Sequence, residues 1–400
     1  MDDLSEQIGA LKRTMEQLQG LVEKQQDRIV ALEEANRALR EHVSTPPTRG
    51  SATPTPNPTV KGFQRLNPEI GVVLDLVATS SESRADSEGN DRLAVREMEL
   101  VIGQEVDPYG RFDSTITFSD FEDVEVEEAY VTYWDLPWDL QLRAGRMRPK
   151  IGKANLLHRD QLDTVDEPLV IQRYLGIEGL FKTGVELSRF LPKPASWWTP
   201  ELTLGAMEGG VGEDGALFGS TRRRLSFYAH LKNFFEISDS SDFELGLTYL
   251  MGSQDDDGRF EVNTLGVDTT YHRYFSEGRR LKLQSELYAQ DRRESFAFDD
   301  DGFVIDYRGH PFGFYSLLDY RINTRWGIGA RIDYVEPVSN PPWNPHHEDR
   351  GYSTYVTFYQ SEFARLRLQY ERVELANGDE DDMFFLQGTY SLGVHKHAIK

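Results

Sequence analysis

The sequence predicts an all-β fold, an antiparallel transmembrane β-barrel of about 16 strands preceded by an N-terminal α-helical coiled coil. Three observations predict it. Apolar and polar residues alternate along the chain after residue 62, short and long connections alternate between these segments, and the first 42 residues carry a heptad repeat. We therefore expect three parts: a coiled coil over 1–42, a linker over 43–62 and a barrel over 63–400.

The N-terminal part is expected to oligomerise through the coiled coil. Its core positions read Ile8, Met15, Val22, Ile29 and Asn36 in one row and Leu4, Leu11, Leu18, Gln25, Leu32 and Leu39 in the other. β-Branched residues and Met in one row with Leu in the other are typical of two or three strands. The alternative is a single amphipathic helix that lies on another domain, although such helices normally show a wider apolar stripe.

Composition indicates a linker after this helix. Residues 43–62 contain five prolines among several Thr and Ser residues. Such a stretch cannot build a hydrophobic core and favours an extended, semi-rigid chain.

Alternation with a period of two indicates strands over the rest of the chain. In one such segment the apolar residues Leu366 and Leu368 flank Arg367. Segments of this kind predict strands near 69–79, 93–106, 111–120, 125–135, 139–147, 182–190, 200–207, 224–236, 243–252, 263–275, 281–291, 312–322, 326–336, 352–360, 365–374 and 383–394.

The connections between these segments differ in length in a regular way. Short turns such as Asp107-Pro108-Tyr109-Gly110 fall at every second connection, whereas the intervening ones, such as 293–311, are mostly longer and acidic. This asymmetry between the two ends is typical of bacterial outer-membrane barrels. A soluble β-sandwich or β-solenoid is the alternative, but neither has a reason to segregate its connections. Aromatic residues expected in girdles at the membrane interfaces are Tyr130, Tyr133, Trp134, Trp138, Trp197, Trp198, Trp326, Tyr352 and Tyr359.

Composition also excludes several classes of function. The 400 residues include 44 Lys and Arg against 67 Asp and Glu, and the resulting charge of −23 argues against nucleic-acid binding. Without cysteine the chain has no disulfide scaffold, thiolate zinc site or cysteine nucleophile. The sequence shows no Gly-framed nucleophile, His-Glu metal motif or phosphate loop, so we expect neither an enzyme nor a bound cofactor.

The longest connection, residues 148–181, is expected to fold into the barrel as a constriction. It mixes apolar residues such as Ile151 and Leu162 with charges, which suits a segment that packs on the wall of a channel; an outward flap is the alternative. A barrel of about 16 strands encloses water, so charges that face it would select solutes. The candidate pore-lining residues are Arg143, Arg146, Arg148, Lys150, Lys153, Asp160, Asp163, Asp166, Arg331, Asp333, Arg365, Arg367 and Glu371.

Two stretches resemble known outer-membrane proteins. The barrel pattern resembles general porins, and one motif resembles the start of the third outer loop of phosphate-selective porins of Gram-negative bacteria: Leu142-Arg143-Ala144-Gly145-Arg146-Met147-Arg148-Pro149-Lys150. The stretch from Asn67 through Arg148, including Asp107-Pro108-Tyr109 and the segment 124–130, resembles a poorly characterised proteobacterial group sometimes labelled zinc-regulated receptors. The resemblance implies an outer-membrane location with the coiled coil in the periplasm, a third loop that narrows the lumen, and a homotrimer.

These features predict a porin, a passive diffusion channel for small hydrophilic solutes or ions whose outer face contacts outer-membrane lipid. The basic residues between 143 and 153 could guide anions, whereas the acidic outer loops favour cations. Because Met1 is followed by Asp2 and Asp3 and not by a signal sequence, we expect the chain to be a mature form with an added Met.

Two further functions remain open. One is zinc binding or uptake at the outer membrane, because imidazole and carboxylate groups suit Zn²⁺. The candidate ligands are His310, His346, His347, Glu348 and Asp349. The other is a structural tether of the cell envelope, in which the coiled coil reaches peptidoglycan or a periplasmic partner.

Overall fold

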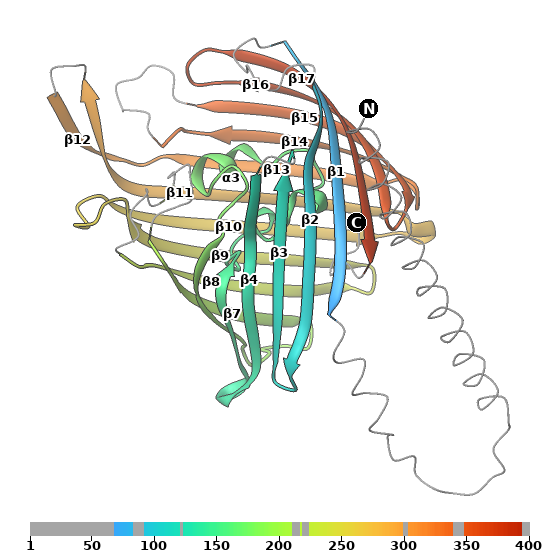
Figure 1. Cartoon of the computed structure of the whole chain (residues 1–400), viewed down its shortest axis with the longest axis horizontal. Helices are drawn as coiled ribbons and strands as arrows, with labels where there is room; N and C mark the ends of the chain where they lie inside the picture. The colour runs from blue at the N-terminus through green and yellow to red at the C-terminus, as the bar shows by residue number, and fades with distance from the viewer. Residues whose placement is uncertain are drawn as a thin grey trace, which may run out of the picture. The chain divides into compact units, whose positions relative to one another are not determined.

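Sixteen antiparallel strands close into a ring (Figure 1). The computed structural model describes residues 68–82, 92–120, 123–209, 217, 224–298, 303–338 and 348–393. The predicted coiled coil over 1–42 and the predicted linker over 43–62 lie outside the described residues. In the described part of the chain, no helix combines the length and the apolar character needed to cross a membrane.

Every strand predicted from the sequence overlaps one strand of the ring. The ring strands are β1 (Glu69–Ser81), β2 (Arg92–Asp107), β3 (Gly110–Ser119), β4 (Asp123–Leu136), β5 (Leu140–Met147), β6 (Lys182–Phe190), β7 (Trp198–Met207), β8 (Ser226–Ser238), β9 (Ser241–Ser253), β10 (Glu261–Tyr274), β11 (Arg280–Phe298), β13 (Phe312–Arg321), β14 (Trp326–Val335), β15 (Asp349–Ser361), β16 (Ala364–Glu374) and β17 (Glu380–Gly393). The short helical elements are η1 (Pro137–Asp139), η2 (Ala154–Leu156), η3 (Arg159–Gln161), α3 (Leu169–Tyr174) and η4 (Ser276–Gly278).

The first and last strands close the ring. β1 pairs with β17 from Gly71 opposite Gly393 to Ser81 opposite Met383, and on its other edge it pairs with β2. Consecutive ring strands pair in order between these two, so each has a neighbour on both edges. A closed ring satisfies the backbone groups of its strands internally, which is the condition for a sheet to cross lipid.

One extra strand lies outside the ring and corrects the prediction for residues 293–311. β12 (Phe303–Gly309) pairs only with the C-terminal part of β11, from Arg292 to Phe298. The N-terminal part of β11, from Arg280 to Ala289, pairs instead with β13. The predicted acidic loop is therefore largely a β-hairpin that extends beyond the wall (Figure 1). Its backbone continues the ladder from Arg292 opposite Gly309 to Phe298 opposite Phe303, in spite of its acidic residues.

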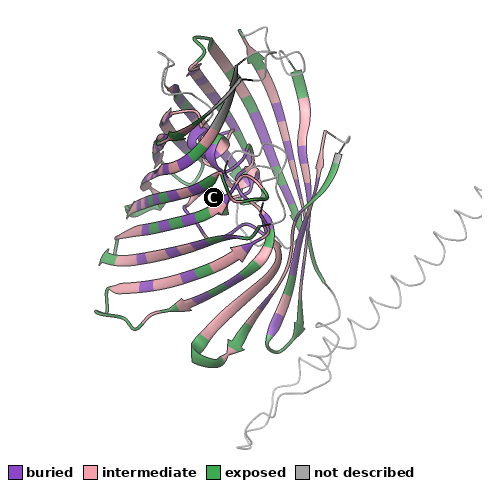
Figure 2. Ribbon diagram, turned by 90° about the vertical axis from the view of Figure 1, so that its left-hand side faces the viewer, coloured by how far each residue is buried: buried purple, intermediate pink, exposed green. Residues whose placement is uncertain are grey.

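The wall has a polar inner face and an apolar outer face. On β16, Arg365, Arg367 and Gln369 are buried inside the ring, whereas Leu366 and Leu368 are 40% and 52% exposed. The same alternation of buried and exposed residues follows most strands (Figure 2). Outward apolar residues surrounding inward polar ones are what a barrel needs in order to lie in lipid.

Most of the predicted girdle aromatics lie at the surface near strand ends. Trp138, Trp197 and Trp326 are exposed, as expected for interfacial side chains. The prediction for Tyr359 is wrong. Tyr359 is buried and lies on the same inward face of β15 as Tyr355. Its ring lies 3.8 Å from the Arg321 guanidinium, so it belongs to the inner wall.

A charge on the outer face should destabilise the barrel in lipid. Leu247 lies at the centre of β9 and is 45% exposed, so Leu247→Arg should lower the free energy of unfolding in lipid vesicles by about 2–4 kcal/mol. Leu247→Met is the matched control and should cost less than about 1.5 kcal/mol. Urea titration in vesicles measures both, and an Arg variant as stable as the wild type would contradict a lipid-facing wall.

Candidate functional site

The connection between β5 and β6, residues 148–181, lies inside the ring and is called the strap below. Its residues contact wall side chains from strands that are far apart around the ring, including Arg96 on β2, Lys282 on β11 and Arg367 on β16. Only a segment inside a closed ring can reach all of these strands. The predicted inward fold of residues 148–181 is therefore what the structure has, and α3 is seen within the ring in Figure 1.

The strap is mostly irregular, and its one α-helix is a single short element. α3 follows Pro168, which fixes its first turn, and four of its six residues are buried apolar or aromatic residues. Gly152 lies where the strap passes closest to β11. It has a φ of 60°, and a Cβ there would collide with the Glu286 carboxylate and the Tyr288 hydroxyl, so this approach requires glycine.

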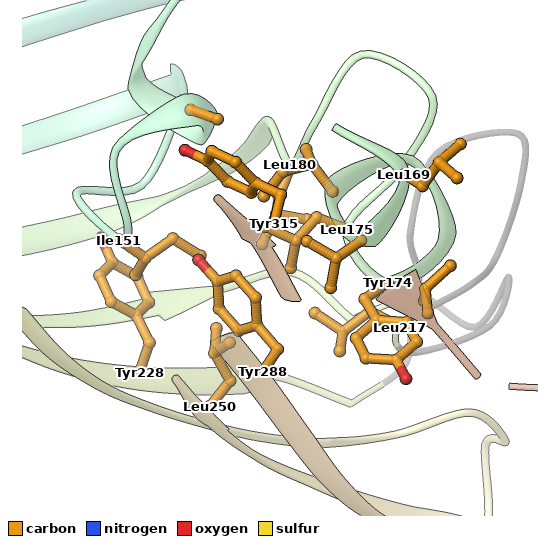
Figure 3. Packing of buried hydrophobic residues seen from close by; sticks show 14 of the residues in the cluster. Ile151, Leu169, Tyr174, Leu175, Leu180, Leu217, Tyr228, Leu250, Tyr288 and Tyr315 are labelled. Carbon is orange, nitrogen blue, oxygen red and sulfur yellow. The ribbon is translucent and has the colours of Figure 1, made fainter. Parts of the chain in front are cut away.

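One half of the strap is held by apolar packing. Ile151, Leu169, Tyr174, Leu175 and Leu180 pack against inward side chains of the wall, as Figure 3 shows. The wall side of this apolar cluster includes Tyr228, Leu250, Tyr288 and Tyr315. Because these side chains are fully buried between strap and wall, the cluster fixes the path of both the beginning and the end of the strap.

The wall also supplies carboxylates that accept the backbone N–H groups of the strap. These hydrogen bonds run from Arg148 to Glu128 at 3.0 Å, from Lys150 to Glu186 at 3.0 Å, from Ala154 to Glu286 at 2.6 Å and from Leu169 to Asp333 at 3.0 Å. Two of the carboxylates are held in turn by tyrosines. Tyr228 donates to Glu186, and Tyr315 donates to Glu286, each at 2.6 Å.

Wall guanidinium groups donate to the backbone carbonyl oxygens of the strap. Arg367 donates to the carbonyls of Leu162 at 2.9 Å and Thr164 at 2.7 Å. The other donors and their acceptors are Arg365 to Asp160 and Leu162, Arg331 to Asp166, Arg96 to Val165, and Arg143 to Arg148. The backbone carbonyl groups of residues 160–166, in the middle of the strap, thus find hydrogen-bond partners in the wall.

Ion pairs add to these bonds across the boundary between strap and wall. Arg331 is fully buried and contacts Asp166 and Asp333, each at 2.6 Å, and Glu371 at 3.3 Å. Further pairs join Lys282 to Asp163 at 2.7 Å, Lys153 to Glu244 at 2.6 Å, Lys150 to Glu201 at 3.3 Å and Arg148 to Glu127 at 3.2 Å. Removing one partner of a buried pair leaves a charge without compensation, which is costly.

The pKa values of two ionisable strap residues, His158 and Glu167, are raised. Burial tends to lower the pKa of His158, but Glu99, Glu127 and Glu128 surround its ring and raise this pKa well above 6.5. The ring nitrogens lie 3.0 Å from Glu127 and 3.1 Å from Glu128. Burial raises the pKa of Glu167 to about 8, so this carboxyl group is mostly protonated at neutral pH.

The structure places the predicted pore-lining residues together at the boundary between strap and wall. Arg148, Lys150, Lys153, Asp160, Asp163 and Asp166 lie on the strap, and Arg143, Arg331, Asp333, Arg365, Arg367 and Glu371 face it from β5, β14 and β16. Arg146 lies apart from the central strap, where it pairs with Glu125 at 2.5 Å and stacks on Phe181. Their role in lining a pore remains a prediction.

Sequence reasoning missed several residues that hold the strap. These are Arg96, Glu127, Glu128, Glu186, Gln369, Tyr228, Tyr288 and Tyr315. The alternation of polar and apolar residues could have identified Glu186 and Gln369, because both lie at inward-facing positions of their strands. Arg96 gives no such signal, because it sits at a bulge between β1 and β2.

The described residues of the predicted zinc site each contact a different partner and do not come together. Arg173 donates to Asp349 at 2.9 Å, Arg350 pairs with Glu348, and His310 is exposed and lies 3.6 Å from Asp291. His346 and His347 lie outside the described residues. Within the described ranges, no group of three His, Cys, Asp or Glu side chains could hold a metal ion, so the zinc site remains a prediction.

Comparison with known sequences finds a distant relative and no matching family model. An uncharacterized protein of Aquifex aeolicus is 25% identical over 295 residues, which are 68% of this chain and 61% of that protein. The match therefore spans about three fifths of the length of this relative.

Comparison with solved structures identifies the fold. OmpF of Salmonella typhi is similar with a TM-score of 0.55 and 8% identity, over 81% of this chain and 97% of that one. OprB of Pseudomonas putida gives 0.54 and 10%, over 84% and 96%. The outer membrane channel DcaP of Acinetobacter baumannii gives 0.50 and 10%, over 81% and 95%. The chain therefore has the fold of outer-membrane porins and channels.

Removing the Arg331 side chain should strongly weaken the attachment of the strap. Arg331→Met leaves Asp166, Asp333 and Glu371 close together without a counter-charge, so the free energy of unfolding should fall by about 3–5 kcal/mol. Arg331→Lys keeps the charge but not the fork of donors, so its loss should be smaller. Denaturant titration in detergent compares them, and a loss below about 1 kcal/mol for Met would refute a central role for this cluster.

The attachment of the strap should weaken as pH rises. His158 has a folded pKa raised above 6.5, so its stabilisation is complete below pH 6.5 and is lost as pH rises through the folded pKa. Glu167 acts in the same direction, because its pKa rises from 4.5 to about 8 on folding. Glu167 should make the free energy of unfolding fall between pH 4.5 and 8, and His158 should add to this fall above pH 6.5. We expect the His158→Gln/Glu167→Gln double variant to show a flatter profile. An unchanged slope in the double variant would rule out these two groups.

Proposed function

We propose that the protein is an outer-membrane porin, a passive diffusion channel for small hydrophilic solutes or ions, and that the strap narrows its lumen. The observation that carries this proposal is a closed ring of sixteen strands, apolar outside and polar inside, with residues 148–181 held within it. A ring of this size encloses more space than wall side chains can fill. The shared fold with outer-membrane porins and channels supports the same function.

The connections support one orientation in the membrane. The short turns after β2, β4, β8, β10, β13 and β15 all lie at one end of the ring, because consecutive strands are antiparallel. In outer-membrane barrels short turns face the periplasm and longer loops face outside. We assign the same orientation here, with the N-terminal coiled coil in the periplasm. We further propose a homotrimer and no enzymatic step.

The charges that the strap and wall present to each other would determine which solutes pass. Ion pairs such as Lys282 with Asp163 place opposite charges close together in the lumen. Fixed charges of both signs around a narrow path act on the charge and dipole of a solute. Residues on the strap are therefore the ones whose substitution should alter selectivity.

Planar-bilayer recording tests the channel. Purified protein should insert with stepwise increases in conductance. Replacing residues 154–175 with a short Gly-Ser linker should increase the size of each step, because it removes the segment that fills the lumen. The matched control shortens the hairpin of β11 and β12 over residues 293–308, which extends beyond the wall, and should leave the step size unchanged.

The two parts of the proposal can fail independently. Wild-type protein that is folded, yet shows no steps in any salt, would overturn the channel. A linker variant that is folded and has wild-type steps would keep the channel and overturn the role of the strap as a constriction.

A further inference from the structure

Two buried arginines of the inner wall have no acidic partner. Arg365 and Arg367 lie on adjacent inward positions of β16, and each is only 1% exposed. Among the described residues, no carboxylate oxygen lies within 4.0 Å of either guanidinium group. Buried charges in proteins are normally paired, so this pair requires an explanation.

The hydrogen-bond partners of both arginines are uncharged. From the strap they are the backbone carbonyl oxygens of Asp160, Leu162 and Thr164. From the wall they are Thr389 for Arg365 at 3.4 Å, and Thr357 and Gln387 for Arg367, each at 3.1 Å. Every hydrogen-bond acceptor of the two guanidinium groups is thus neutral, and neither group is in direct contact with a described carboxylate.

Several other basic groups in the lumen are paired with carboxylates. Arg331 has three carboxylates around it, and Lys282 pairs with Asp163. The basic residues after β5, which the sequence suggested as an anion track, pair with wall glutamates. The acidic groups that act from farther away are Asp75 and Asp160 on Arg365, and Asp163 on Arg367. Asp75 is already paired with Arg96 at 2.5 Å, and Asp163 with Lys282 at 2.7 Å.

We propose that Arg365 and Arg367 form a binding site for a small oxyanion, a carboxylate or a phosphate, and that strap carbonyl oxygens hold its place in this structure. The inference rests on the proposed channel and names the class of solute it binds. Alternate positions on one face of a strand are about 7 Å apart, so two guanidinium forks can converge on one anion. Hydrogen bonds from arginine to an ionised oxygen are about twice as strong as those to a neutral one.

Anion and strap would therefore compete for the same donors. Residues 158–166 contribute no side chain to the apolar cluster that anchors the rest of the strap. An anion that takes the guanidinium groups frees the carbonyls of 160–164, and this part of the strap can then move while α3 stays in place. Binding of the solute is thereby coupled to opening of its own path.

Conductance tests the site. In wild-type channels the conductance should saturate as the concentration of acetate or inorganic phosphate rises, as expected for a binding site in the path. In Arg365→Gln/Arg367→Gln the concentration at half-saturation should rise roughly ten- to a hundredfold, the effect of losing charge-assisted hydrogen bonds. The two probes distinguish a carboxylate site from a phosphate site. Equal saturation in wild type and variant would overturn the proposal.

Thiol labelling tests the competition with the strap. The chain has no cysteine, so Leu162→Cys introduces a single thiol at a buried strap residue and keeps its carbonyl oxygen. Its labelling by a small thiol reagent should accelerate with phosphate or acetate but not with chloride, and this dependence should vanish when Arg365 and Arg367 are glutamine. The matched control, Asp291→Asn/Arg308→Met, removes an exposed ion pair on the hairpin of β11 and β12, away from the strap, and should retain the dependence.

Each outcome has one meaning. Channels that conduct, but show neither saturation nor anion-dependent labelling, would overturn the anion site and leave the channel intact. Protein that is folded but never conducts would overturn the channel itself, and labelling would still report whether an oxyanion displaces the strap. If the double glutamine variant does not fold, single Arg367→Lys, which keeps the charge and loses the fork, should still weaken the phosphate dependence.

Discussion

An irregular backbone enclosed in a barrel has peptide groups that need partners, and this requirement organises the inner wall of the protein. The strap has one six-residue α-helix and two three-residue 3-10 helices, so many of its N–H and C=O groups find no partner within the strap itself. Wall carboxylates accept from its N–H groups, and wall guanidinium groups donate to its carbonyls. The charged residues of the lumen therefore do structural work as well as any work on solutes, since a buried peptide group without a partner is costly.

This arrangement gives the two kinds of wall charge different surroundings. The carboxylates of Glu186 and Glu286 accept hydrogen bonds from tyrosine hydroxyls as well as from strap N–H groups, so several donors stabilise each negative charge. Arg331 is balanced by carboxylates, but Arg365 and Arg367 meet only neutral oxygens. Two guanidinium groups on β16 thus have no described carboxylate in direct contact, even though the whole chain carries a charge of −23. Net charge alone says little about what the interior attracts.

The wall was predictable from the sequence, and the attachment of the strap was not. Period-two alternation is a local signal, and at Leu366 and Arg367 it correctly assigns one residue to each face. It extends to Gln369 but fails for the hairpin of β12, where acidic residues interrupt the pattern. The bonds that hold the strap join residues far apart in sequence, such as Arg331 and Asp166 or Arg365 and Asp160, separated by 165 and 205 positions. No local pattern records which wall residue faces which part of an irregular segment.

The two modes of attachment divide the strap into parts that respond differently to their surroundings. The ends and α3 are held by the apolar cluster, whose stabilisation depends on buried area and which offers no charged group for a dissolved ion to bind. Residues 160–166 are held through polar contacts with β14 and β16, and Asp163 adds an ion pair with β11. Polar contacts can be exchanged for contacts with a solute of the right charge, whereas apolar contacts cannot. A channel built in this way can keep its constricting segment inside the barrel while the central part of that segment yields to the solute.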